Sequence, residues 1–245
     1  STGTFAGVIK GNVQISGCHV ENISGVSNVN NWTGGFVGYI SGVTKYEVLS
    51  GLLGAVTDAL STLLNLIPLL GLGDLITILL NGGVLKVESL IPIGYVNPIL
   101  TDCSASGNVI VSGQKYTGGF AGESIGAVMK NCSVEGTDSV SGIDYSGGFA
   151  GRSSNAVVVG LLSSLGIEVM GNFPVNTVML GCKINGRANV SSTGDSATKS
   201  GYAGGFIGEM RNSYAVDCCI ADLGAVNGKD YVGGFAGMAT LGDVA

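Results

Sequence analysis

The chain has 245 residues, of which 43 are glycine and 4 are proline, with 11% charged residues and a net charge of −6. This composition excludes intrinsic disorder, which needs few apolar residues and many charges, and it excludes collagen, because glycine follows no three-residue period. It argues against a mostly helical enzyme, since each glycine inside a helix costs about 1 kcal/mol. No basic run is present, so the sequence predicts no nucleic-acid partner.

The N-terminal residues 1–4 lack the basic and apolar regions of a signal peptide. We interpret the chain as a mature or excised segment of a longer protein. The 6 cysteines are too sparse for a small disulfide-stapled scaffold.

One motif recurs along the chain: an aromatic residue, any residue, Gly-Gly-Phe, a small apolar residue and Gly. The first copy is degraded to Gly3–Gly7, and the later copies keep the pattern. The phenylalanines of the motif are Phe5, Phe36, Phe120, Phe149, Phe206 and Phe235. The aromatic residues four positions earlier are Trp32, Tyr116, Tyr145, Tyr202 and Tyr231. A motif recurring at fixed intervals is the signature of a repeat architecture.

A cysteine marks a second position of the same repeat, 12 residues after a phenylalanine and 17 before the next. These cysteines are Cys18, Cys103, Cys132, Cys182 and Cys218. The unit is therefore about 29 residues long, and the longer intervals contain two insertions, at 41–98 and 152–178. Both insertions enter the same arc of the unit, which places them on one side of a stack.

Each unit offers short β-type runs broken by glycine, such as 128–134 and 145–150, and none reaches the length of a typical helix. Such a unit cannot bury its own apolar positions, so it must stack on its neighbours. We therefore predict an all-β fold for residues 1–245: a right-handed parallel β-helix, or β-solenoid, of about six coils. A propeller is the alternative, but its blades need about 40–50 residues.

Stacking would place residues of one register above one another. The phenylalanines are predicted to form an aromatic ladder in the core, with the glycine pair at a corner where a Cβ atom would clash. The Tyr/Trp ladder fits either the core or the rim. The cysteine column fits disulfides or metal ligation, or else a column of small buried thiols; the odd number and the lack of a CxxC pair favour the thiols.

The first insertion is rich in leucine and isoleucine, and we predict two short helices in it, at 57–68 and 73–81. Asp58, Pro68 and Asp74 interrupt the apolar run, which argues against a membrane span of about 20 apolar residues. A similar apolar run occupies 157–165 in the second insertion. These segments either pack on the solenoid or contact a partner, which would be another copy, a surface or a lipid. The candidate partner contacts are Leu52, Leu53, Leu63, Leu64, Leu66, Ile67, Leu69, Leu70, Leu75, Ile76, Ile78, Leu79, Leu161 and Leu162.

The sequence contains none of the motifs HExxH, the P-loop and GGxGxD, which serve metal-dependent catalysis, phosphate binding and calcium binding. Its charged residues are scattered, and we find no column of carboxylates. The only histidine, His19, is interpreted as a surface residue without a role. We therefore predict no enzyme activity, no cofactor and no metal.

The motif Tyr-x-Gly-Gly-Phe-Ala-Gly, followed by the Asn-Cys-Ser-Val step at 131–134, resembles the GLUG-type repeats of bacterial cell-surface proteins. The leucine-rich insertions depart from that pattern. The resemblance implies a large secreted or wall-attached solenoid, often an adhesin or a stalk. We therefore expect a non-catalytic extracellular or cell-surface rod or filament subunit.

The expected partners are further copies or neighbouring segments of a longer chain, a surface glycan or a protein target, and membrane contact is not expected. The alternative function is a carbohydrate-active or carbohydrate-binding β-helix.

Overall fold

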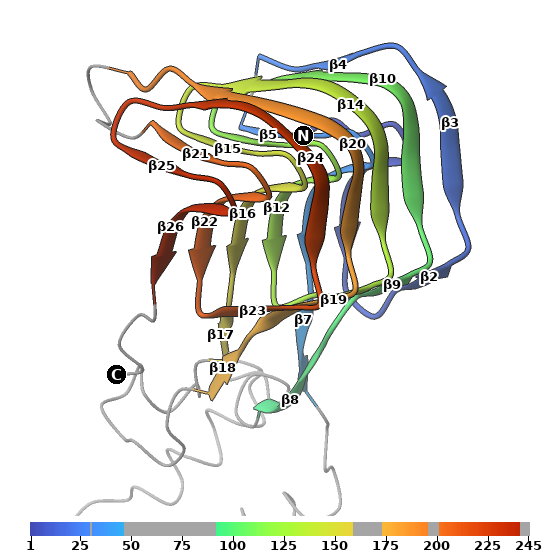
Figure 1. Cartoon of the computed structure of the whole chain (residues 1–245). Coiled ribbons are helices and arrows are strands. Elements are labelled where there is room, and N and C mark those ends of the chain that lie inside the picture. Colours follow the sequence, from blue (N-terminus) through green and yellow to red (C-terminus); the bar gives the residue numbers. More distant parts are fainter. Residues whose placement is uncertain (30, 47–91, 159–172, 196–200, 241–245) are drawn as a thin grey trace, which may run out of the picture. The chain divides into compact units, whose positions relative to one another are not determined.

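The computed structural model describes residues 1–29, 31–46, 92–158, 173–195 and 201–240 (Figure 1). The chain divides into two compact units. The first contains residues 1–43, 96–157 and 174–245, and thus the repeats. The second contains residues 44–95 and 158–173, which belong to the insertions.

The described residues form strands and no helix, and the strands of the repeats build four parallel sheets, in the manner of a β-helix. Sheet A contains β5 (Trp32–Gly34), β11 (Tyr116–Gly118), β15 (Tyr145–Gly147), β21 (Tyr202–Gly204) and β25 (Tyr231–Gly233). Sheet B contains β1 (Ala6–Lys10), β6 (Val37–Ser41), β12 (Ala121–Ile125), β16 (Ala150–Ser154), β22 (Ile207–Arg211) and β26 (Ala236–Thr240).

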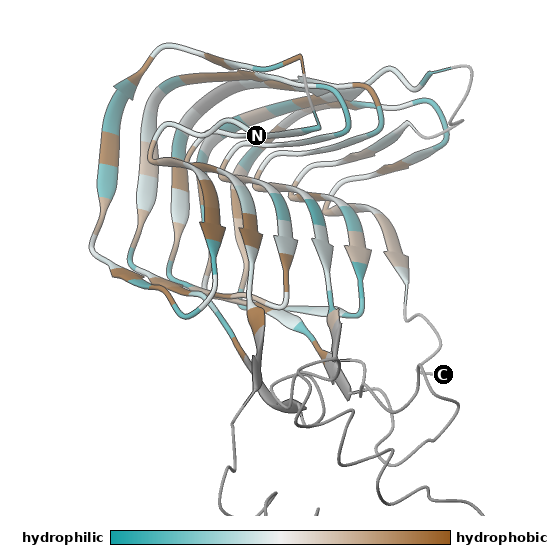
Figure 2. Cartoon of the chain, turned by 180° about the vertical axis from the view of Figure 1, so that it is seen from behind, coloured by the Kyte–Doolittle hydropathy of each residue, from teal (hydrophilic) through white to brown (hydrophobic). Residues whose placement is uncertain are grey.

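Sheets C and D complete each repeat. Sheet C contains β2 (Gln14–Ser16), β9 (Ile99–Thr101), β13 (Val128–Lys130), β19 (Thr177–Leu180) and β23 (Ser213–Val216). Sheet D contains β3 (His19–Ile23), β4 (Val26–Ser27), β10 (Ser104–Ser112), β14 (Ser133–Gly142), β20 (Lys183–Ser192) and β24 (Cys219–Asn227). Within each sheet the strands follow chain order, so every repeat pairs with the repeats before and after it. Figure 2 shows apolar and polar residues interspersed along these strands.

The sequence predicts helical insertions at 41–98 and 152–178, but wherever the structure describes these ranges it shows no helix. The chain enters and leaves the first insertion through β7 (Val43–Tyr46) and β8 (Pro92–Val96), which pair with each other. Strands β17 (Ala156–Val158) and β18 (Phe173–Val175) pair in the same way at the second. Valine in these flanks favours strands. The predicted helices at 57–68 and 73–81, and most of the run at 157–165, lie outside the described residues.

The six phenylalanines of the repeat stack ring on ring through the core. Neighbouring ring centroids are 4.6–4.9 Å apart and the ring planes differ by only 3–8°. The four central rings are fully buried, whereas Phe5 is 42% exposed and Phe235 is 38% exposed. Each inner ring therefore contacts two others, and the two outer rings contact one each.

The glycines before each phenylalanine are required by space, because the corner between sheets A and B brings backbone against backbone. A Cβ atom on Gly147 would lie 2.0 Å from the carbonyl oxygen of Ala150, in the same repeat. A Cβ atom on Gly148 would lie 2.3 Å from the carbonyl oxygen of Gly205, in the next repeat. Neither glycine has a positive φ, so the steric exclusion of a side chain explains the choice.

A second corner explains why a small polar residue or glycine precedes each cysteine. This position has φ between 51° and 61° in all five repeats. Only glycine, asparagine and aspartate adopt such backbone angles readily. The five residues are Gly17, Asp102, Asn131, Gly181 and Asp217. The Asn-Cys step is thus a left-handed corner that turns the following cysteine into the core.

Candidate functional site

The outward side of the corner between sheets A and B brings two columns of side chains together. The Tyr/Trp ladder comes from sheet A. The second column comes from sheet B and consists of the residues three positions after each phenylalanine. In register, these residues are Val8, Tyr39, Glu123, Arg152, Glu209 and Met238. The central repeats therefore carry Glu, Arg and Glu on adjacent strands.

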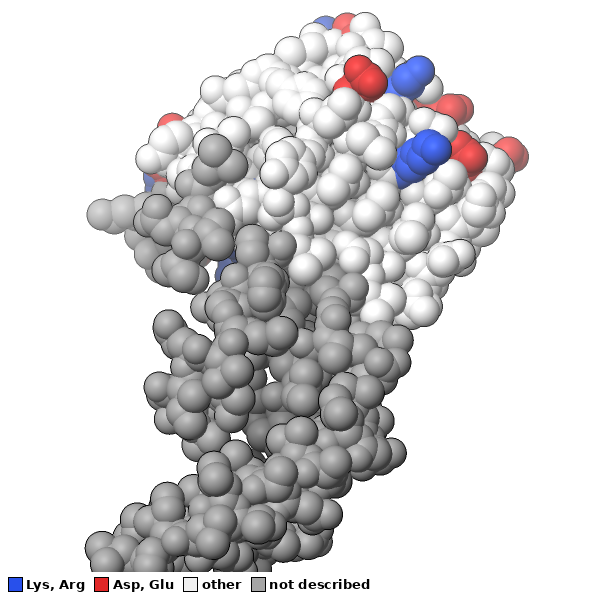
Figure 3. Space-filling model, turned by 90° about the horizontal axis from the view of Figure 1, so that it is seen from below, with Lys and Arg blue, Asp and Glu red and all other residues white. Residues whose placement is uncertain are grey.

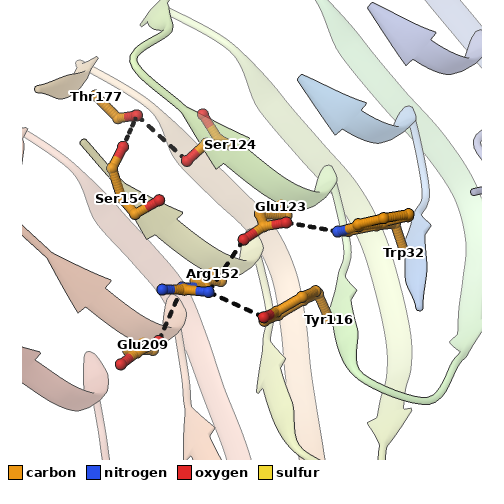
Figure 4. A network of polar contacts seen from close by, with 8 residues as sticks. All are labelled: Trp32, Tyr116, Glu123, Ser124, Arg152, Ser154, Thr177 and Glu209. Atoms are coloured by element: carbon orange, nitrogen blue, oxygen red, sulfur yellow. Dashed lines mark hydrogen bonds and ion pairs between the residues drawn. The ribbon is translucent and has the colours of Figure 1, made fainter. Parts of the chain in front are cut away.

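Five side chains form what we call the corner network: Trp32, Tyr116, Glu123, Arg152 and Glu209 (Figure 4). The Trp32 indole donates a hydrogen bond to Oε2 of Glu123 at 2.5 Å. Nη1 of Arg152 donates to Oε1 of Glu123 at 3.3 Å and to the Tyr116 hydroxyl at 2.9 Å. Nε of Arg152 lies 2.9 Å from Oε2 of Glu209. That last pair is close but not aligned as a hydrogen bond, so its attraction is ionic.

The network is largely removed from water. The side chains of Glu123 and Glu209 are 5% and 7% exposed, and that of Arg152 is 21% exposed. Burial raises the pKa of Glu123, although the Trp32 hydrogen bond and the Arg152 charge oppose the shift. Burial lowers the pKa of Arg152, but Tyr116, Glu209 and Glu123 outweigh this effect and leave the pKa raised.

In this arrangement a single guanidinium, that of Arg152, contacts both buried carboxylates. A glycosidase needs two carboxyl groups that both face the scissile bond. Here Glu123 and Glu209 lie two strands apart, which corresponds to about 10 Å between their Cα atoms, and Arg152 lies between them and contacts both. The geometry supports cross-linking of three neighbouring repeats more directly than acid–base chemistry.

The Tyr/Trp ladder is half-buried along the same corner. Tyr116 and Tyr145 stack at 5.2 Å, while Tyr145–Tyr202 and Tyr202–Tyr231 meet edge to face at 5.0 and 4.7 Å. Tyr116 is buried and Tyr231, in the last repeat, is 49% exposed. Burial raises the pKa of Tyr145 to about 12. The four tyrosine rings thus contact one another, and the Trp32 ring packs against Tyr39 with centroids 5.1 Å apart, so the ladder does not present a flat strip of exposed faces.

A neighbouring contact ties the second insertion's exit to sheet B. The Thr177 hydroxyl donates to the carbonyl oxygen of Ser154 at 2.6 Å and also contacts that of Ser124 at 3.3 Å (Figure 4). Thr177 is fully buried, so these bonds satisfy a hydroxyl that would otherwise be costly to bury.

An open hollow of about 380 Å³ lies over the outer surface of sheet D and is lined by polar side chains, including Glu21, Asp102 and Glu135. Within it, Nδ1 of His19 lies 2.8 Å from Oγ of Ser104. Among the described residues no carboxylate is hydrogen-bonded to this imidazole, so the pair lacks the orienting group of a catalytic triad.

All six cysteines are free, and the five in register form one column. Cys103, Cys132 and Cys182 are buried, Cys18 and Cys218 are half-buried, and Cys219 is exposed. Within the described ranges, no cluster of three or more His, Cys, Asp or Glu side chains is placed to hold a metal ion.

Sequence reasoning missed the corner network, although the signal was available. Glu123, Arg152 and Glu209 each stand three residues after a motif phenylalanine. Aligning charged residues on the phenylalanine register would have found them, whereas aligning on the cysteines did not. The candidate partner contacts at 52–79 and 161–162 lie outside the described residues.

The described surface in Figure 3 is largely uncharged; most of its few acidic and basic side chains lie toward the upper right, with a few more at the top and the left edge. No helix in the described ranges is long and apolar enough to cross a bilayer. Comparisons with known protein families, curated proteins and solved structures gave no match. The resemblance to GLUG-type repeats therefore stays a prediction from the motif.

Proposed function

We propose that this chain is a non-catalytic structural rod of an extracellular or cell-surface protein, an adhesin, stalk or filament subunit. The observation that carries the proposal is the continuity of its columns: one phenylalanine ladder connects all six motif copies without a break. The buried charges of the corner network add ties between neighbouring repeats. Such cross-linking stiffens a stack in which each repeat contacts only its neighbours.

The finer features of the fold belong to the same proposal. We infer about six coils that wind in a right-handed sense, as a strand–crossover–parallel strand connection favours. An extracellular setting fits the low charge and the small polar surface residues. The bacterial cell-surface origin rests on the repeat motif alone.

Contact with further copies, or with neighbouring segments of a longer chain, is the proposed mode of action, and the first and last described repeats supply the contacts. Phe5 in the first described repeat and Phe235 in the last each stack on one other ring only, and Val232, in the same repeat as Phe235, is 50% exposed. Exposed edge strands are templates for pairing with another chain. The first and last strands of each described sheet have one unpaired edge, and we infer that these edges receive the neighbouring copy or segment.

Electron microscopy of the purified full chain tests this proposal. We expect particles joined end to end, with a fraction that rises with protein concentration, because a head-to-tail contact that does not close generates open assemblies. Strictly single particles at all concentrations would count against self-association and leave only a rod that acts through its neighbours or targets.

The alternative function is a carbohydrate-active or carbohydrate-binding β-helix, and the observation that favours it is the pair of glutamates beside the Tyr/Trp ladder. Against it, both carboxylates contact Arg152, and the Tyr116 and Tyr145 rings cover each other. Incubation with a panel of glycans separates the two proposals. Turnover or binding that Glu123→Gln abolishes in a folded protein would establish the alternative and overturn the structural one.

A further inference from the structure

The cysteine column is more regular than a set of space-filling thiols requires. Main-chain hydrogen bonds fix its register, because the residue after each cysteine donates to the carbonyl oxygen of the cysteine in the preceding repeat. These N–O distances are 2.9–3.1 Å at all four steps of the column. The four donors are Ser104, Ser133, Lys183 and Cys219.

All five side chains also adopt the same orientation. Each Sγ atom lies 3.3–3.7 Å from the carbonyl oxygen two residues before it in its own repeat. The four later Sγ atoms also lie 3.4–3.8 Å from a carbonyl oxygen of the preceding repeat. With equal register and equal orientation, the spacing of neighbouring sulfur atoms equals the strand spacing, which is about 4.8 Å.

This spacing matches a particular kind of metal site. Two metal–sulfur bonds of about 2.3 Å, the length known for zinc thiolates, span about 4.6 Å when laid end to end. Soft thiolate ligands select Cu(I), and this ion accepts two ligands in a straight line. Zinc instead needs four ligands in a tetrahedron, which a straight column of side chains does not supply.

We propose that adjacent cysteines of the column bind Cu(I) in two-coordinate sites, one ion between two sulfur atoms. On binding, each of the two thiols releases its proton, two S–Cu bonds form, and the complex carries one net negative charge. No oxidant or reductant is involved. The proposal goes beyond the structural role and does not depend on it.

The geometry also limits which thiols share an ion. A sulfur atom that bound an ion on both sides of a straight column would need its two metal bonds opposite each other, which the bent geometry of sulfur disfavours. Each thiolate therefore holds one ion. Burying the negative charge costs least where a partner is half-exposed, so the pairs are Cys18–Cys103 and Cys182–Cys218, and Cys132 stays unpaired.

The test counts Cu(I) ions bound by the full chain. Exposed Cys219 is first replaced with alanine in every sample, and the reduced protein is titrated without oxygen against Cu(I) held by the chromophore bicinchoninate. We expect about two Cu(I) ions per chain. Removing Cys132 leaves both pairs, so Cys132→Ala keeps about two ions. Removing Cys182 leaves Cys218 without a neighbour, so Cys182→Ala keeps about one.

Cys132→Ala and Cys182→Ala are matched controls, because both thiols are fully buried in the middle of the column. Circular dichroism shows whether each variant folds, and Cys103→Ala replaces Cys182→Ala with the same expected loss if the latter does not. Equal Cu(I) counts for the Cys132 and Cys182 variants would overturn the pairing. A chain that takes no Cu(I) from the chromophore would overturn the site itself.

Discussion

Replacing Phe149 with alanine removes the middle of the aromatic ladder. Its side chain is fully buried and stacks on Phe120 at 4.9 Å and on Phe206 at 4.8 Å. Truncating a buried phenylalanine costs about 3–5 kcal/mol, and each ring pair adds about 0.5–1.5 kcal/mol beyond area burial. We expect a loss near the upper end of the first range, about 5 kcal/mol in the free energy of unfolding.

Phe5→Ala is the matched control, because Phe5 belongs to the same ladder but is 42% exposed and contacts only Phe36, at 4.6 Å. We expect it to cost about 2 kcal/mol, less than half the loss at Phe149. Equilibrium unfolding in guanidinium chloride measures both, with the midpoint falling while the slope stays constant. Equal losses in the two variants would refute the view that ladder continuity stabilises the stack.

Substitutions at four further sites, two of them with a control substitution, probe other parts of the structure. Arg152→Ala leaves two buried carboxylates without their cation and should cost about 3–5 kcal/mol in chemical denaturation. Burial raises the folded-state pKa of Glu123, so its contribution favours the fold at low pH and is lost as pH rises through that pKa; Glu123→Gln should flatten this decline in a pH series of melting curves. Gly147→Ala should prevent native folding, and circular dichroism would show the loss of the native spectrum. A Cβ atom on Gly25 would meet only one atom, at 3.8 Å, so Gly25→Ala should fold normally. Asn131→Val forces a β-branched residue to φ 51° and should lower the melting temperature, while Asn131→Gly should not.

The repeat and its parallel stacking could be predicted from the sequence because each marker residue recurs at one register. A phenylalanine such as Phe149 and a cysteine such as Cys132 recur at the same position of each repeat, with glycine at the corners. These patterns can be found from residue spacing alone. The Tyr/Trp ladder could not be placed, because its exposure depends on how sharply the chain turns at Gly147 and Gly148. The corner network has a register signal, since Glu123, Arg152 and Glu209 each follow a phenylalanine by three residues, but the contacts of Arg152 across strands depend on side-chain geometry that spacing does not give.

The cysteine column could also be predicted only in part from the sequence. Its existence follows from the 29-residue spacing, but the common orientation of the thiols depends on the left-handed corner at Asn131 and its equivalents. The sequence favoured a column of buried thiols over disulfides or metal ligation. The regular thiol–carbonyl contacts are what favour a linear ion site between neighbours.

Sedimentation velocity of the full chain across a concentration series tests the central claim, that this protein acts as a rod that associates through its ends. We expect larger species to grow with concentration and to disappear in Phe235→Asp, which places a charge on the exposed end of the ladder. Ile110→Asp, at a position that is 41% exposed on the inner strand β10, should sediment like the unmodified chain. A single monomeric species at every concentration, unchanged by Phe235→Asp, would contradict the claim.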